Sequence, residues 1–185
     1  PISDDIFKGV NRVIVTACGT AWHAGLVGRH LIEAMIRIPV TVELASEFRY
    51  MNPILDEHTL VVVITQSGET ADSLAALRLA NERGAKTISI VNVKGSSIAR
   101  ESDYVLYTHA GPEIAVASTK AFSVQCAGMY LIALKLAEVN NLMTDEQMKD
   151  FCDKFEQAIG TVEEVLKMDD YIKGISEKIK DTFSA

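Results

Sequence analysis

The sequence has few cysteines and no run of basic residues, and each shortage excludes a class of protein. Its three cysteines, Cys18, Cys126 and Cys152, lie far apart, so neither a disulfide framework nor a paired metal-binding knuckle is indicated. Acidic residues outnumber basic ones by 25 to 18, and no cluster of Lys or Arg could follow a nucleic-acid backbone. We therefore expect no metal, no cofactor and no nucleic-acid partner.

Long apolar runs are also missing. The longest apolar stretches, such as residues 60–64, have the length of a strand rather than that of a bilayer. The first residues lack the basic-then-apolar pattern of a signal peptide. We expect a soluble, cytoplasmic protein with no membrane partner. Because the chain starts at Pro1 and stops just after an amphipathic run, we interpret it as a fragment of a longer protein.

Five short runs rich in β-branched residues alternate with longer helical patterns. Three of them, around Val13, Val61 and Ile88, are almost continuously apolar, which is typical of parallel strands covered by helices on both faces. The pattern predicts a three-layer, doubly wound α/β fold with a five-stranded parallel sheet, similar to flavodoxin-like and Rossmann-like folds. The predicted strands are residues 12–16, 40–44, 60–65, 87–92 and 104–108.

Helical periodicity fills the intervals between the strands and the end of the chain. Gly84 stands where a left-handed helix end is needed, and Thr144 where a helix N-cap is needed. Since 48% of the 185 residues are apolar, we expect one domain over residues 1–185, with an α/β core to about residue 140 and helices over about 141–185. The predicted helices are residues 21–36, 71–82, 118–138, 144–167 and 170–180.

Hydroxyl and amide side chains follow the central strand directly, in the segment LVVVITQSGETADSL at 60–74. Gly68 permits a tight turn, the following helix start offers free N–H groups, and Thr65, Ser67 and Thr70 add hydroxyl donors. This chemistry suits a phosphate. The alternative is an ordinary strand-to-helix turn in which Ser67 and Thr70 only cap the helix.

Two further polar loops strengthen the phosphate interpretation. TACGTAWHAG at 16–25 follows the first strand, and GPEIAVASTKAF at 111–122 follows the fifth, with Ser118 at a predicted helix start. Loops at the carboxyl ends of parallel strands meet at one edge of the sheet. Neither the Walker spacing nor the three-glycine dinucleotide fingerprint is present. A phosphorylated polyol is therefore the expected ligand.

The motifs TQSGETADS, ACGTAWHAG, ELASEFRY and EIAVASTKAF, in their positions along the chain, carry a family resemblance. Together they resemble the first sugar isomerase (SIS) subdomain of the glutamine:fructose-6-phosphate amidotransferases, which make glucosamine-6-phosphate. The resemblance covers nearly the whole chain. Thr65 stands where many relatives have Ser, and Ala21 lacks the hydroxyl of its counterpart. The site residues that the resemblance implies are Thr20, Thr65, Gln66, Ser67, Gly68, Thr70, Val116, Ala117 and Ser118.

The resemblance also implies which domains of the full-length enzyme hold its catalytic groups. Such an enzyme condenses ammonia from glutamine with fructose-6-phosphate and isomerises the product, using catalytic groups in a glutaminase domain, a second SIS subdomain and a carboxyl-terminal tail. We therefore assign no catalytic residue here and expect this chain to bind fructose-6-phosphate or glucosamine-6-phosphate without turnover. The expected partners are the missing domains of the same enzyme and a second copy in a homodimer.

Other interpretations remain open from the sequence alone. Glu69, His23, His109, Glu113 and Cys18 are acids, bases or nucleophiles by type, but none has a visible partner, and we expect Glu69 to lie in the first turn of a helix. The alternatives for the whole chain are a stand-alone SIS isomerase, such as one acting on arabinose-5-phosphate, a sugar-phosphate sensor module, or a nucleotide-binding α/β domain.

Overall fold

The computed structural model describes residues 2–114 and 118–182. Its sheet has the strand order β2-β1-β3-β4-β5, and all neighbouring strands are parallel. This confirms the predicted five-stranded parallel sheet, and each strand starts and ends within a residue of its predicted bounds. The strands are β1 (Arg12–Ala17), β2 (Val40–Leu44), β3 (Thr59–Thr65), β4 (Lys86–Val91) and β5 (Tyr104–Tyr107).

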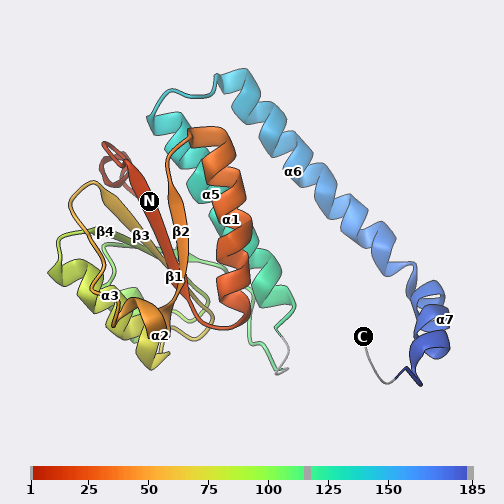
Figure 1. Ribbon diagram of the computed structural model, residues 1–185. Coiled ribbons are helices and arrows are strands. Elements are labelled where there is room, and N and C mark those ends of the chain that lie inside the picture. The colour runs from red at the N-terminus through yellow and green to blue at the C-terminus, as the bar shows by residue number, and fades with distance from the viewer. Residues whose placement is uncertain (1, 115–117, 183–185) are drawn as a thin grey trace. The chain divides into compact units, whose positions relative to one another are not determined.

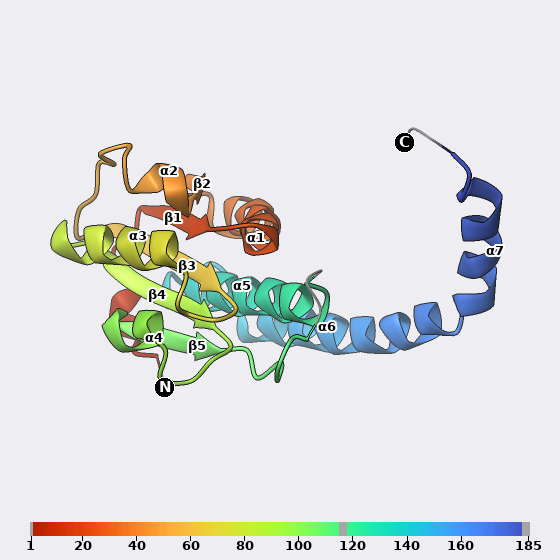
Figure 2. The ribbon, with the colours of Figure 1, turned by 90° about the horizontal axis from the view of Figure 1, so that it is seen from below.

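Helices cover both faces of the sheet and complete the three predicted layers (Figures 1 and 2). On one face lie α1 (Thr20–Ile36) and α5 (Lys120–Val139), which pack against each other. On the other lie α2 (Ala45–Phe48), α3 (Ala71–Glu82) and α4 (Ser97–Glu101), which form one apolar cluster with the strands. The sequence did not indicate the short helices α2 and α4, nor the 3-10 turn η1 (Asp4–Ile6).

Close packing of α1 against α5 depends on glycine. A Cβ on Gly28 would lie 2.3 Å from Cε of Met129, and one on Gly128 would lie 3.1 Å from Cδ1 of Ile90. The two helices therefore approach each other and the sheet more closely than larger residues would permit. By length and composition alone α5 could cross a membrane. It is a core helix here, because Met129, Ile132 and the neighbouring small residues on that side are buried.

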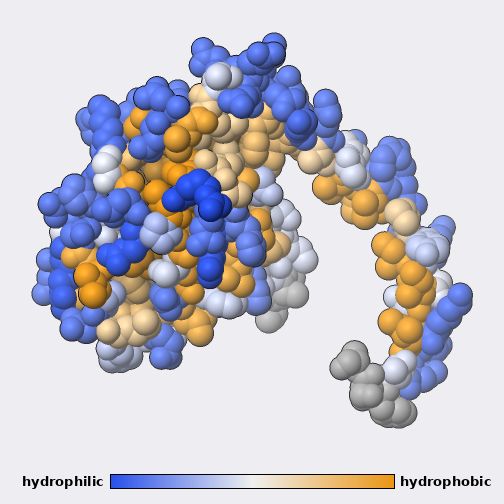
Figure 3. Space-filling model, turned by 45° about the horizontal axis from the view of Figure 1, so that its top comes forward, coloured by the Kyte–Doolittle hydropathy of each residue, from blue (hydrophilic) through white to orange (hydrophobic). Residues whose placement is uncertain are grey.

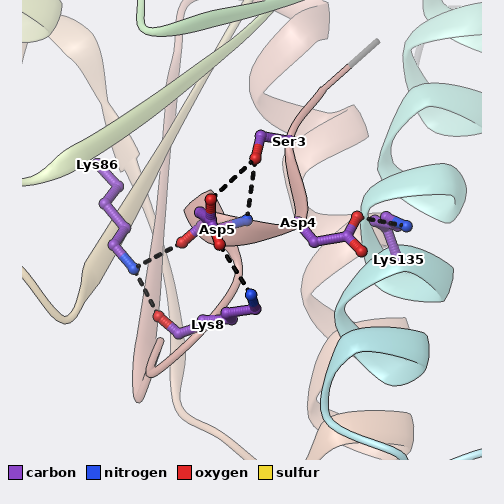
Figure 4. A network of polar contacts seen from close by, with 6 residues as sticks. All are labelled: Ser3, Asp4, Asp5, Lys8, Lys86 and Lys135. Carbon is purple, nitrogen blue, oxygen red and sulfur yellow. Dashed lines mark hydrogen bonds and ion pairs between the residues drawn. The ribbon is translucent and has the colours of Figure 1, made fainter.

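Polar contacts hold the start of the chain against the amino end of the sheet, away from the loops that follow the strands (Figure 4). Lys86, at the start of β4, donates to the backbone carbonyls of Asp5 and Lys8, at 3.4 and 2.6 Å. Lys135 of α5 pairs with Asp4 at 2.7 Å, and Lys8 pairs with Asp5 at 2.8 Å. The two ion pairs lie at the surface, where each contributes at most about 1 kcal/mol.

The chain divides into two compact units, residues 1–142 and 143–185. The second contains α6 (Asp145–Leu166) and α7 (Asp169–Ile179). Thr144 is the N-cap of α6, as predicted, and it forms a reciprocal capping box with Gln147. Figure 3 shows apolar side chains gathered along one side of these helices and hydrophilic side chains along the other. The exposed apolar residues include Ile159, Val162, Leu166, Ile172, Ile175 and Ile179.

Candidate functional site

The candidate site lies where the order of strands reverses, at the carboxyl ends of β1 and β3. The ends of these adjacent strands are paired, with Ala17, the last residue of β1, beside Ile64, the residue before the last of β3, so the loops that follow them start side by side. In open parallel sheets this switch point is where ligands bind. A cavity of about 260 Å³ lies there, lined by Cys18, Thr20, Ala21, Ile64, Thr65, Gln66, Ser67, Thr70, Glu113, Ser118 and Gln125.

The loop after β3 is a tight turn that only glycine can make at its centre. Gly68 has a φ of 70°, and a Cβ there would lie 2.0 Å from Oγ of Ser96. Within the turn, the N–H of Gly68 donates to Oγ1 of Thr65 at 3.2 Å, and the N–H of Glu69 donates to Oγ of Ser67 at 3.3 Å. Both hydroxyls accept hydrogen bonds in these contacts, so each keeps its proton available for a ligand.

Thr70 is the N-cap residue of α3, but within the described part of the chain its side chain makes no capping hydrogen bond. Ser67 bonds inside the turn rather than to the helix. The alternative in which these two residues only cap α3 is therefore wrong for their side chains. Thr70 lines the cavity at the start of α3, where the first N–H groups of the helix have no partner within the helix.

The electrostatics of the cavity come from helix starts rather than from cationic side chains. Thr20 is the first residue of α1, Thr70 caps α3, and Ser118 stands two residues before α5. Three helix N-termini, each with free N–H groups and the positive end of a dipole, thus meet at one cavity. None of the described residues that line it is Lys, Arg or His.

Glu113 is the one acidic residue in this lining, and its carboxylate has a structural partner. Its Oε2 accepts a hydrogen bond from the N–H of Ala121 at 3.1 Å, in the first turn of α5. The residue at the N-cap position, Thr119, makes no such bond within the described residues. Glu113 thus caps α5 from a distance, and the helix N-terminus offsets part of its charge.

Six of the nine predicted binding residues line the cavity. Gly68 does not, because it packs behind the turn against Ser96, and Val116 and Ala117 lie outside the described residues. Sequence reasoning missed Gln125 altogether, whose only signal is an amide within the apolar run of α5. It also left Cys18, Ala21, Ile64 and Glu113 out of the binding set. The six residues in place are Thr20, Thr65, Gln66, Ser67, Thr70 and Ser118.

The prediction that Glu69 lies in the first turn of a helix is wrong. It precedes the N-cap of α3, and its carboxylate instead accepts from the N–H of Ser97 at 2.8 Å, at the start of α4. This backbone hydrogen bond, with a second from the Ser97 side chain, lowers the pKa of Glu69 below its ordinary value. The carboxylate therefore links the loop after β3 to the connection between β4 and α4.

Two other groups that resembled catalysts by type, His23 and Cys18, make packing contacts. The rings of Trp22 and His23 lie edge to face, with centroids 5.0 Å apart, and Nε1 of Trp22 donates to the carbonyl of Val42 at 3.2 Å. Sγ of Cys18 lies 3.9 Å from Oγ of Ser73. None of these contacts supplies a base for a cysteine nucleophile.

A larger cavity of about 650 Å³ lies elsewhere, along β5 and the outer side of α5. Apolar side chains, among them Leu106, Leu131 and Ile132, form much of its lining. Its described lining has fewer hydroxyl side chains than that of the smaller cavity, Ser102 and Tyr104 alone, and includes no residue that begins an α-helix. The smaller polar cavity remains the better candidate for a charged ligand.

The chain belongs to the SIS domain family, whose pattern matches residues 6–135. Among its relatives, the glutamine–fructose-6-phosphate aminotransferase [isomerizing] of Clostridium tetani is 49% identical over 185 residues, covering 98% of this chain and 30% of that protein. The enzyme of the same name from Streptomyces coelicolor is 51% identical over 178 residues, covering 96% and 29%. These matches confirm the resemblance drawn from the motifs.

A solved structure gives the same result for the fold. The C-terminal domain of glucosamine-fructose-6-phosphate aminotransferase from Francisella tularensis aligns with a TM-score of 0.93 at 37% identity, covering 96% of this chain and 51% of that one. The chain therefore has the fold of one SIS portion of these enzymes. It spans about 30% of the length of the curated relatives.

Proposed function

We propose that the cavity at the ends of β1 and β3 binds the phosphate and sugar of fructose-6-phosphate or glucosamine-6-phosphate. The observation that carries the proposal is Thr70, which lines the cavity at the N-cap position of α3 and whose side chain makes no capping bond among the described residues. A phosphate oxygen there accepts from the hydroxyl of Thr70 and from the free N–H groups of α3. Thr65 and Ser67 add two more donors, and Thr20 and Ser118 face the sugar.

The activity of the complete enzyme is part of the same proposal. In it, ammonia released from glutamine replaces the carbonyl oxygen of fructose-6-phosphate, and the product isomerises to glucosamine-6-phosphate, in hexosamine biosynthesis. Proton transfer between neighbouring carbons requires a positioned base. The only acid among the described lining residues is Glu113, which caps α5. This chain accordingly binds the sugar phosphate, and the remainder of the enzyme supplies the chemistry.

The partners follow from the same reasoning. We propose that the chain works with a glutaminase domain and a second SIS subdomain of one polypeptide, in a homodimer. The apolar sides of α6 and α7 support this proposal, because exposed apolar surface of such extent favours a protein partner. We also infer a cytoplasmic location, which the unpaired state of Cys18, Cys126 and Cys152 supports.

The test is calorimetric titration of the purified chain with fructose-6-phosphate, before and after Thr70→Val. Valine keeps the shape of threonine and removes the hydroxyl. Since a hydrogen bond to a charged group contributes about 1.5–3 kcal/mol, the affinity should fall about 10- to 150-fold. Thr41→Val, on an exposed residue of the edge strand β2, is the matched control and should leave binding unchanged.

Titrations with glucose-6-phosphate, arabinose-5-phosphate and AMP separate the remaining alternatives. Tighter binding of arabinose-5-phosphate favours a stand-alone isomerase, and tighter binding of AMP favours a nucleotide-binding domain. Equal affinity of the Thr70→Val variant and the wild type for fructose-6-phosphate would contradict the assignment of the phosphate to this loop.

A further inference from the structure

Gln125 is a buried polar side chain in the wall of the candidate site. It lies near the start of α5 and is 2% exposed. Its neighbours on the buried side of the helix, Ala121 and Met129, are apolar. Gln125 nevertheless lines the polar cavity, and its Oε1 has no hydrogen-bond partner among the described residues.

A buried side-chain oxygen without a hydrogen-bond partner lowers the stability of the unliganded fold. A buried carbonyl oxygen without a partner loses its hydrogen bonds to water and gains none in return, and native proteins hold few such groups. Leucine or methionine at this position would continue the apolar side of α5 without that penalty. A ligand that completes the hydrogen bonding of Oε1 explains why an amide stands there.

Because Oε1 is a carbonyl oxygen, only some groups of a ligand can form a hydrogen bond with it. A carbonyl oxygen only accepts hydrogen bonds, and the oxygens of a phosphate monoester dianion, such as that of a sugar phosphate, also only accept. The phosphate is matched by the donors of Thr65, Ser67 and Thr70. Oε1 of Gln125 requires a donor, and the donors that a sugar phosphate offers are its hydroxyl groups, or the amine of an amino sugar.

We propose that Gln125 is a specificity-determining residue, whose side-chain oxygen accepts a hydrogen bond from a sugar hydroxyl or amine. The site then selects a phosphorylated polyol over inorganic phosphate and over simple phosphate esters. This assignment rests on the proposed function and extends it to the sugar end of the ligand.

The test compares three ligands by NMR titration: fructose-6-phosphate, ethyl phosphate and inorganic phosphate. Ethyl phosphate has the ester linkage but no sugar hydroxyl. Gln125→Met keeps the length of the side chain and removes the acceptor. We expect the affinity for fructose-6-phosphate to fall about 3- to 10-fold, while the affinities for ethyl phosphate and inorganic phosphate stay unchanged. Gln157→Met, on an exposed residue of α6, should change none of the three.

A second variant distinguishes recognition from a purely structural role. Gln125→Glu keeps an acceptor oxygen in place, and its charge weakens the binding of all three anions. The ratio of fructose-6-phosphate affinity to ethyl phosphate affinity should therefore stay near that of the wild type in Gln125→Glu and fall in Gln125→Met. The melting temperature of unliganded Gln125→Met should equal or exceed that of the wild type, because an unpartnered polar group has been removed.

Three results would overturn the assignment. An unchanged affinity ratio in Gln125→Met would show that Oε1 does not contact the sugar. An equal loss for all three ligands, together with a lower melting temperature, would assign Gln125 to the packing of α5. If the wild type bound inorganic phosphate and ethyl phosphate with the same affinity as fructose-6-phosphate, the assignment of the phosphate to the loop after β3 would stand and the assignment of Gln125 to the sugar would fail. Binding of none of the three ligands would refute the proposed function itself.

Discussion

Gly68→Ala is the substitution that most directly tests the architecture of the loop after β3. Two costs add at this position. Alanine at a φ of 70° costs about 1–2 kcal/mol relative to glycine. The new Cβ would also lie 2.0 Å from Oγ and 2.5 Å from Cβ of Ser96. Relieving such an overlap in a packed region typically costs about a further 1–3 kcal/mol, for a total of about 2–5 kcal/mol.

The structure offers a control that separates the two costs. Gly84 has a φ of 76° but no atom within 4 Å of its virtual Cβ, so Gly84→Ala should cost only the backbone contribution. The double variant Gly68→Ala/Ser96→Gly removes the overlapping side chain and should recover most of the difference. Trp22 is the only tryptophan and lies in α1, so its fluorescence follows unfolding of the α/β unit in urea.

The expected order of stability is wild type, then Gly84→Ala, then Gly68→Ala, with the last two separated by at least about 1 kcal/mol. For a domain of this size that difference corresponds to roughly 2–4 °C in melting temperature. Equal stability of the two single variants would refute the steric argument. A failure of Ser96→Gly to restore Gly68→Ala would show that the turn, and not its contact with Ser96, governs the cost.

Two further predictions concern other contacts. The hydrogen bond from Ser97 lowers the pKa of the Glu69 carboxyl, so its contribution to stability is complete above the ordinary pKa of glutamate and is lost as the pH falls through the lowered value. Glu69→Gln should therefore reduce the decline in urea stability on acidification below about pH 5, and an unchanged pH profile would contradict this role. Gly28→Ala places a Cβ 2.8 Å from Cβ of Met129 and should destabilise the α1–α5 packing by about 1–3 kcal/mol. Met129→Ala in the same chain should relieve the overlap, and additive effects of the two changes in a double-mutant cycle would exclude a direct contact.

The sequence predicted the strands and the five long helices because each is long enough to show its own periodicity. The helices α2 and α4, with four and five residues, contain about one turn each and give no such signal. Their positions depend on tertiary packing: Phe48 and Ile98 are buried in the cluster beneath α3. The position of Glu69 was predicted wrongly for a related reason. The helix that its carboxylate caps is α4, which is remote along the chain.

The site was predictable as far as its residues follow strands directly. Thr65, Ser67 and Thr70 stand just beyond a strongly apolar strand, and Thr20 stands just beyond another, so their position at one edge of the sheet follows from parallel pairing. Gln125 could not be found in this way. An amide within an apolar helix has the same local pattern whether it points to solvent or into a cavity, and only the folded chain distinguishes the two.

The cavity is built from three separate stretches of chain, around Thr20, Thr70 and Gln125, that meet only when the sheet is complete. The unfolded chain consequently has no binding site for the ligand, and ligand binding shifts the folding equilibrium towards the folded state. At a concentration one hundred times its dissociation constant, such a ligand adds about 2.7 kcal/mol to the free energy of unfolding. A ligand of this cavity would thus also stabilise the fold, and it could compensate for destabilising substitutions in the sheet or in the α1–α5 packing that do not contact the cavity.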